Sequence, residues 1–111
     1  VKPTHIVESG AMLGWGTYML RKAAGPSVHL IVVTPVCPNK KAMPGDKWYM
    51  DPGPATYVCG DKFVDFADVK WATIPGLEDM RARERVLVYF DDHQSEYRRL
   101  LEAQRVGFTH I

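Results

Sequence analysis

The chain has 111 residues, 46% of them apolar and 24% charged, and its 14 basic and 13 acidic side chains leave a formal net charge of +1. This length predicts a single domain over residues 1–111, and the composition is typical of a globular chain and not of a disordered one. The near-neutral charge removes the simplest argument for nucleic-acid binding, which needs a basic excess. No apolar run approaches the roughly 20 residues of a membrane-spanning helix.

The first half of the chain predicts one helix, one strand and a long loop. Residues 11–24 carry apolar side chains at near-helical spacing, and Gly25 and Pro26 end the helix. Residues 28–34 are β-branched and almost continuously apolar, which predicts a strand buried on both faces. Prolines and glycines then follow in quick succession, so residues 35–54 are predicted to form a long, stiff loop.

The second half predicts a hairpin and a strand–helix–strand unit. Residues 56–66 read as a β-hairpin that turns at Gly60 and Asp61. A short strand over 69–74 and a short charged helix over 77–85 follow. Residues 86–90 predict a buried strand, after which Asp91 or Asp92 caps a helix that Gly107 ends, and residues 108–111 add a last short strand. The expected fold is α/β or α+β, with a single small mixed sheet of about four to six strands covered by two or three helices.

The two cysteines, Cys37 and Cys59, have no C-x-x-C spacing. A chain of this length and apolar content does not need a disulfide, so we expect two reduced, half-buried thiols in a cytoplasmic protein. The four histidines do not fall at the short paired spacing of a zinc site, so no metal is predicted there.

Asp91, Asp92 and His93 form one candidate catalytic cluster. They follow a buried strand, and ligands of open α/β sheets bind beyond the carboxyl ends of strands. Two carboxylates beside an imidazole can hold a divalent metal or share acid–base chemistry. The structural alternative is that one aspartate caps the helix and the other is solvated.

Asp68 and Lys70 form a second candidate site. Together with the earlier Asp46 they resemble the PD-(D/E)xK pattern of nucleases, although Asp46 lies in the proline-rich loop. The resemblance implies a Mg²⁺ ion held by the carboxylates and a lysine that orients water. The structural alternative is an exposed strand edge with alternating charge.

The segment from Gly14 to Tyr18, which follows His5, resembles the G-x-G-x-Y segment of ADP-ribosyltransferases. The resemblance covers about a dozen residues and implies an NAD-binding fold, in which a histidine and a tyrosine flank the nicotinamide. The sequence offers no match for the catalytic glutamate of that family, so no catalytic residue is carried over. The structural alternative is close helix packing at small residues.

Two groups of residues are candidates for contacts with partners. Trp48, Tyr49 and Met50 lie in the proline-rich loop, where they either fold back onto the core or anchor a partner. The arginines of the last third can form a basic face; those assigned to binding are Arg81, Arg85, Arg98 and Arg99. Interleaved acidic residues can neutralise part of this face.

No nucleophile with an adjacent base and no phosphate-binding loop of the P-loop type stands out. We therefore expect a small cytoplasmic binding or regulatory module that acts without catalysis, in the manner of an inhibitor or adaptor from a mobile genetic element. A protein is the expected partner, nucleic acid and a second copy are further candidates, and no membrane is expected. The alternatives are a metal-dependent nuclease that uses one of the two candidate sites and, more weakly, the NAD-binding fold.

Overall fold

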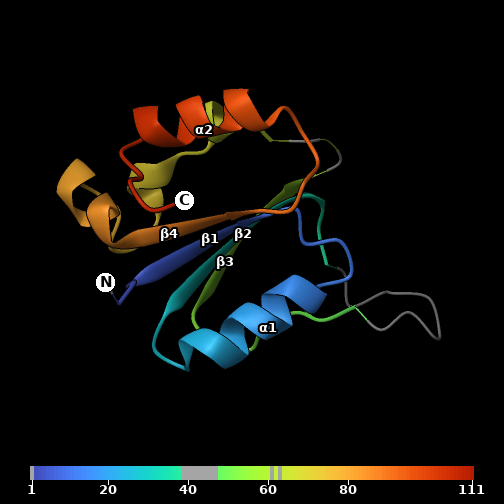
Figure 1. The fold of residues 1–111 in the computed structure, drawn as a ribbon. Coiled ribbons are helices and arrows are strands. Elements are labelled where there is room, and N and C mark those ends of the chain that lie inside the picture. The colour runs from blue at the N-terminus through green and yellow to red at the C-terminus, as the bar shows by residue number, and fades with distance from the viewer. Residues whose placement is uncertain (1, 39–47, 61, 63) are drawn as a thin grey trace.

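In the computed structural model, four parallel strands form one sheet in the order β3-β2-β1-β4 (Figure 1). The structure describes residues 2–38, 48–60, 62 and 64–111. The strands are β1 (His5–Ser9), β2 (His29–Val36), β3 (Ala55–Gly60) and β4 (Val86–Phe90). The predicted α/β class and strand number are confirmed, but all described strand pairs are parallel, so the expectation of a mixed sheet is wrong.

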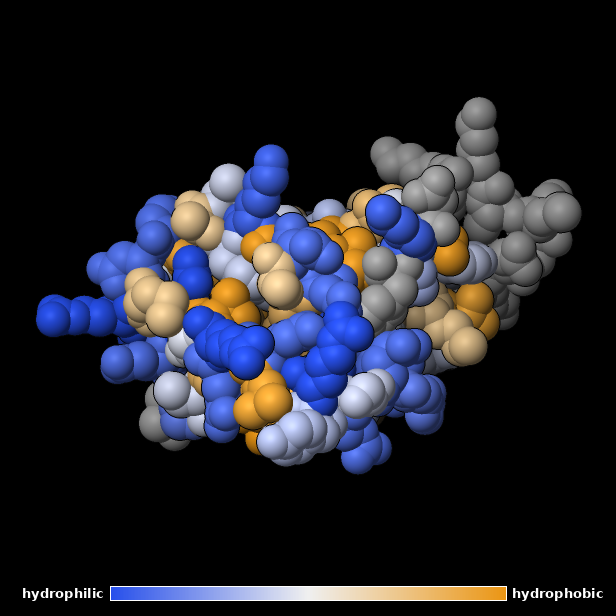
Figure 2. All heavy atoms as spheres, turned by 90° about the horizontal axis from the view of Figure 1, so that it is seen from above, coloured by the Kyte–Doolittle hydropathy of each residue, from blue (hydrophilic) through white to orange (hydrophobic). Residues whose placement is uncertain are grey.

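Helices lie on both faces of this sheet (Figure 1). Helix α1 (Trp15–Ala24) covers one face, and α2 (Glu96–Arg105) covers the other together with three 3-10 helices, η1 (Phe66–Asp68), η2 (Trp71–Thr73) and η3 (Met80–Arg85). Seen from the α2 side, the surface is mainly hydrophilic with scattered apolar residues (Figure 2). No helix in the described part of the chain combines the length and the apolar character of a membrane span.

The core is unequal on the two faces of the sheet. Successive strand residues point to opposite faces, so Ile6 packs on the α1 side and Val7 on the α2 side. The α2-side cluster is large and includes three aromatic side chains, Phe66, Trp71 and Phe108. The α1-side cluster of buried residues contains only Ile6, Val28 and Leu30. The prediction that β2 is buried on both faces is confirmed, because residues 30–34 are all buried.

The predicted hairpin over residues 56–66 is wrong. Strand β3 pairs in parallel with β2, for example Tyr57 with Val32, and the chain then continues into η1. The glycine–aspartate pair is a local turn signal, whereas β3 obtains its ladder from an apolar strand that lies far away in the sequence. Asp61 and Phe63, which the hairpin would have used, lie outside the described residues.

The predicted strand over 69–74 is also wrong, because this segment forms 3-10 turns. The Trp71 indole donates a hydrogen bond to the Phe66 carbonyl oxygen at 2.8 Å, and this bond links η2 to η1. The buried residues recur at intervals of two or three, which suits 3-10 geometry better than strand alternation: Phe66, Val69, Trp71, Ile74 and Leu77. The charged segment after them is likewise a 3-10 helix, η3.

The last predicted unit is confirmed with changes at its ends. The N-cap of α2 is Ser95, so neither Asp91 nor Asp92 has the capping role expected of it. The final strand is reduced to one parallel bridge between Leu87 and His110, supported by a 2.8 Å hydrogen bond from the Val88 amide to the His110 carbonyl oxygen.

The expectation of two reduced thiols is wrong, since Cys37 and Cys59 form a disulfide with their Cα atoms 4.9 Å apart. Cys37 directly follows β2, and Cys59 lies in the neighbouring strand β3. The hairpin interpretation concealed this proximity, because it paired β3 with the residues that follow it and not with β2.

Candidate functional site

The candidate site lies beyond the carboxyl ends of β1 and β4. The chain leaves β1 through α1 toward β2 and β3 and later returns to β4 on the opposite side of β1. Sheets of this order bind ligands in the crevice at the point where the strand order reverses. Two cavities adjoin this point, and both are lined by the segment Asp91–Gln94.

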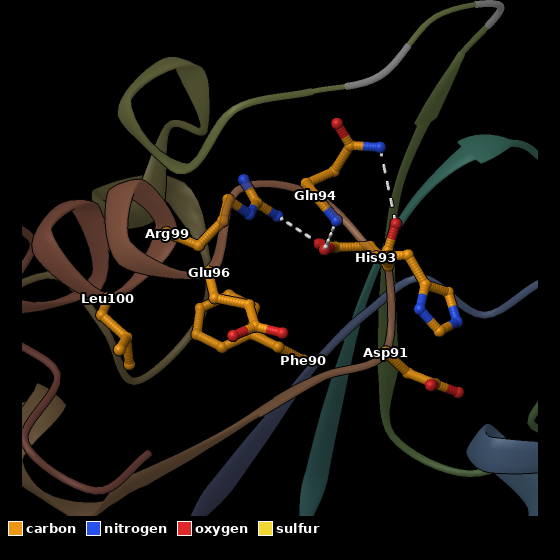
Figure 3. Close-up of a pocket in the computed structure, with 8 residues that line it drawn as sticks. Phe90, Asp91, His93, Gln94, Glu96, Arg99 and Leu100 are labelled. Atoms are coloured by element: carbon orange, nitrogen blue, oxygen red, sulfur yellow. Dashed lines mark hydrogen bonds and ion pairs between the residues drawn. The ribbon is translucent and has the colours of Figure 1, made fainter.

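The first, which we call the central cavity, has a volume of about 400 Å³ and spans the ends of β1, β2 and β4. Besides residues 91–94, its lining consists of Gly10, Met12, Thr34, Pro35, Val36 and Trp48. The second, the α2 cavity, has a volume of about 370 Å³. Its lining adds Phe90, Glu96, Arg99 and Leu100 to the shared segment (Figure 3).

Glycines bring the loop between β1 and α1 close to its neighbours. Gly10 has φ 93°, and a Cβ atom there would lie 2.7 Å from the Asp92 Cα atom. Gly14 has φ 89°, and a Cβ atom would clash with the Tyr49 carbonyl oxygen. A larger residue fits neither the backbone conformation nor the space at these positions. Of the two glycines, Gly10 lines the central cavity.

Glu8 lies under this loop with 2% of its surface exposed. The Thr17 hydroxyl donates a hydrogen bond to Oε2, whereas Oε1 has no hydrogen-bond partner among the described residues and lies against Gly16. Burial, opposed in part by the Thr17 hydrogen bond, raises the pKa of Glu8 to about 7. The N-terminus of α1 is therefore already in contact with a carboxyl group of the protein itself.

Asp92 connects β1, β4 and α2. The Ser9 hydroxyl donates to Asp92 Oδ2 at 2.5 Å and accepts a hydrogen bond from Arg99. Arg99 also donates to Asp92 Oδ2 at 2.8 Å (Figure 3). The backbone amide of Gln94 donates to the other carboxylate oxygen, Oδ1, at 3.1 Å. Asp92 therefore has a structural role, and its charge is balanced by an arginine that is only 2% exposed.

Asp91 and His93 differ from Asp92, since both are exposed and their side chains point away from Arg99 (Figure 3). His93 adopts a left-handed backbone conformation, with φ 53°, which is uncommon for a residue with a Cβ atom. The predicted cluster thus divides into one structural carboxylate and two side chains at the cavity. Within the described residues, no group of three His, Cys, Asp or Glu side chains is placed to hold a metal ion.

The described end of the proline-rich loop, which carries Trp48, Tyr49 and Met50, is partly folded back onto the protein. The Tyr49 hydroxyl donates to Asp51 at 2.9 Å, and Asp51 in turn forms an ion pair with Arg21 of α1 at 2.7 Å. This places Trp48 at the central cavity, whereas Met50 remains 49% exposed. Within this loop, Tyr49 therefore folds back onto the protein, whereas Trp48 lines the central cavity.

The other candidate catalytic residues lie away from both cavities. Asp68 and Lys70 are exposed at the turns between η1 and η2, and Asp46 lies outside the described residues. His5 is buried at the amino end of β1, where its ring bonds the Pro75 carbonyl oxygen at 2.8 Å. Tyr18 lies beyond the carboxyl end of the same strand, so the resemblance to ADP-ribosyltransferases does not bring the two side chains together.

The predicted arginine face is divided. Arg99, which the sequence assigns to this exposed basic face, is buried, with its guanidinium over the Phe66 ring. Arg98 forms ion pairs with Asp65 and Glu102. Arg81 and Arg85 are exposed on η3, and Arg85 also donates to the Lys2 carbonyl oxygen at 3.1 Å. These partners neutralise or bury half of the predicted basic surface.

The sequence interpretation missed β1 and with it Glu8, Ser9 and Gly10. The available signal is the short apolar run before the glycine-rich stretch Gly10–Gly16, which is typical of a strand–loop–helix unit. No protein-family model, curated protein or solved structure matches this chain.

Proposed function

We propose that the protein binds a small nucleoside-like molecule without phosphate groups in the central cavity. The observation that carries this proposal is the position of the cavity at the reversal of strand order, combined with a lining that contains the exposed Asp91 and, among the described residues, no lysine or arginine. Crevices at this position are the usual binding sites for nucleotide cofactors in α/β sheets.

The lining suits a flat ring with polar edges. Met12, Val36 and Trp48 supply apolar and aromatic surface against which a base can stack. Thr34, Asp91 and His93 supply hydrogen-bonding groups, and the volume lies in the range of small-molecule sites.

The charges favour a neutral or cationic ligand over a phosphate. A phosphate at this loop would normally accept hydrogen bonds from the N-terminus of α1, but the buried carboxyl of Glu8 lies there. The exposed carboxylate of Asp91 adds further negative potential. Nucleoside cofactors of the S-adenosylmethionine class carry positive charge in place of phosphate and match this arrangement.

Isothermal titration at pH 7.5 with four probes tests the proposal. S-adenosylmethionine is expected to bind most tightly and adenosine more weakly, with AMP and NAD weakest of all. Asp91→Asn is expected to reduce the preference for S-adenosylmethionine over adenosine by about tenfold, equivalent to about 1.4 kcal/mol. Tightest binding of AMP or NAD, or binding of none of the four, would contradict the proposal.

Matched methionines provide the control. Met12→Ala, at the cavity, is expected to weaken binding, whereas Met19→Ala, on the exposed side of α1, leaves it unchanged. Equal effects of the two substitutions would show that the ligand does not occupy the central cavity.

Two sequence-based expectations remain predictions. Contact with a protein through Trp48, Tyr49 and Met50 is supported by the exposure of Met50. A cytoplasmic location is weakened by the Cys37–Cys59 disulfide, because disulfides are rare in cytosolic proteins.

A further inference from the structure

The loop before α1 and the outer side of that helix form an exposed apolar surface. Residues 9–20 contain no charged side chain. Four large apolar side chains of this segment are strongly exposed: Met12 at 81%, Leu13 at 41%, Trp15 at 67% and Met19 at 64%. We call these four residues the α1 patch. The opposite face of the protein, seen in Figure 2, is mainly hydrophilic.

We propose that the α1 patch is the contact surface through which two copies of this chain associate. A dimer with two-fold symmetry places the same patch on both sides of the interface, so a charged patch would repel its copy. An uncharged patch meets its copy without this repulsion. Tryptophan and methionine are also the residue types enriched at the centres of protein interfaces, whereas Lys, Glu and Asp are depleted there.

The size of the patch is sufficient for a weak dimer. At roughly 200 Å² for each fully exposed large side chain, the observed exposures correspond to about 500 Å² per protomer. Two such surfaces bury about 1,000 Å² together, which is the lower limit for a specific interface. We therefore expect a dissociation constant in the micromolar range or weaker, and a monomer at high dilution.

The patch is presented on a helix that is held firmly. Arg21 on α1 donates to both carboxylate oxygens of Asp51, and the Thr17 hydroxyl donates to Glu8 beneath the helix. Trp15 and Met19 lie one helical turn apart on the outer side of α1. A surface that is fixed before association loses little conformational entropy on binding.

Sedimentation velocity between 5 and 500 µM tests this proposal. We expect the sedimentation coefficient to rise with concentration, and we expect the double variant Trp15→Ser/Met19→Ser to weaken association by at least tenfold. Tyr97→Ser/Leu100→Ser is the matched control, because these residues are 75% and 41% exposed on α2, on the other face of the sheet. A monomer throughout the concentration range, or a loss of association in the control variant alone, would overturn the proposal.

A second measurement follows the tryptophans directly. The Trp15 indole N–H resonance is expected to shift with protein concentration, whereas that of Trp71, which is buried and bonded to the Phe66 carbonyl oxygen, stays constant. A constant Trp15 resonance together with concentration-dependent sedimentation would place the interface elsewhere. Neither Trp15 nor Met19 lines the central cavity, so ligand binding is expected to survive the double variant, and the two proposals can fail independently.

Discussion

Glu8→Gln is expected to change how the stability of the protein depends on pH. The ordinary pKa of a glutamate is 4.5, and burial raises that of Glu8 to about 7 in the folded protein. Below pH 4.5 the carboxyl is protonated in both the folded and the unfolded states, so its burial does not lower stability through ionisation. As the pH rises toward 7, the unfolded chain releases the proton while the folded protein keeps it, and stability is lost.

The size of this loss follows from the two pKa values. At about 1.4 kcal/mol per pKa unit, ionisation of Glu8 costs about 3 kcal/mol above pH 7. The difference in the free energy of unfolding between the variant and the original protein should therefore shift by about 2 to 3 kcal/mol in favour of the variant from pH 5 to pH 8. The amide also alters the contacts with Thr17 and Gly16, but that offset does not depend on pH, so the comparison across pH isolates the ionisation.

Urea unfolding of both proteins at pH 5, 6, 7 and 8, followed by tryptophan fluorescence, measures the effect. Parallel stability curves for the two proteins would refute the reasoning, because they would mean that Glu8 ionises as easily in the folded state as in the unfolded one. Thr17→Val provides a second check. Loss of its hydrogen bond to the carboxylate should raise the pKa of Glu8 further and extend the pH range over which stability falls.

Two further substitutions test the packing around the site. Arg21→Met leaves Asp51 buried without its cation and is expected to cost about 3 to 5 kcal/mol in urea unfolding, so a loss below 1 kcal/mol would show that the ion pair is not needed to hold the loop. Gly14→Ala should cost at least about 1 kcal/mol more than Gly25→Ala, because both glycines have positive φ but only the first would clash, with the Tyr49 carbonyl oxygen. Equal losses in the free energy of unfolding for the two glycine variants would show that the backbone near Tyr49 moves to accommodate the added methyl group without cost.

Local patterns in the sequence were sufficient for the elements that depend on local properties. The run of β-branched residues predicts β2, and the apolar spacing predicts α2. Burial on two faces of a strand or along one stripe of a helix requires a local apolar pattern that can be read from the sequence. No local apolar pattern identifies the strand with which β3 pairs. Its partner is chosen by long-range pairing with β2, and the local turn signal at Gly60 therefore gave the wrong neighbour.

The same distinction explains why the candidate site was recognised only in part. Asp91, Asp92 and His93 were identified as a cluster, but their roles depend on Ser9 at the end of a strand that was not predicted. Only Asp92 turns toward Ser9 and Arg99, while Asp91 and His93 are left at the cavity.

The different positions of Asp91 and Asp92 determine where the charges of this segment lie. Among the described residues, the linings of the two cavities include a single arginine, Arg99, which forms an ion pair with Asp92. The charge of Asp91 remains at the cavity, and Glu8 lies under the adjoining loop. Although the chain has a net charge of +1, the described lining of the central cavity contains no lysine or arginine. The proposed preference for a cation over a phosphate therefore depends on the side chains at the cavity and not on the net charge of the whole chain.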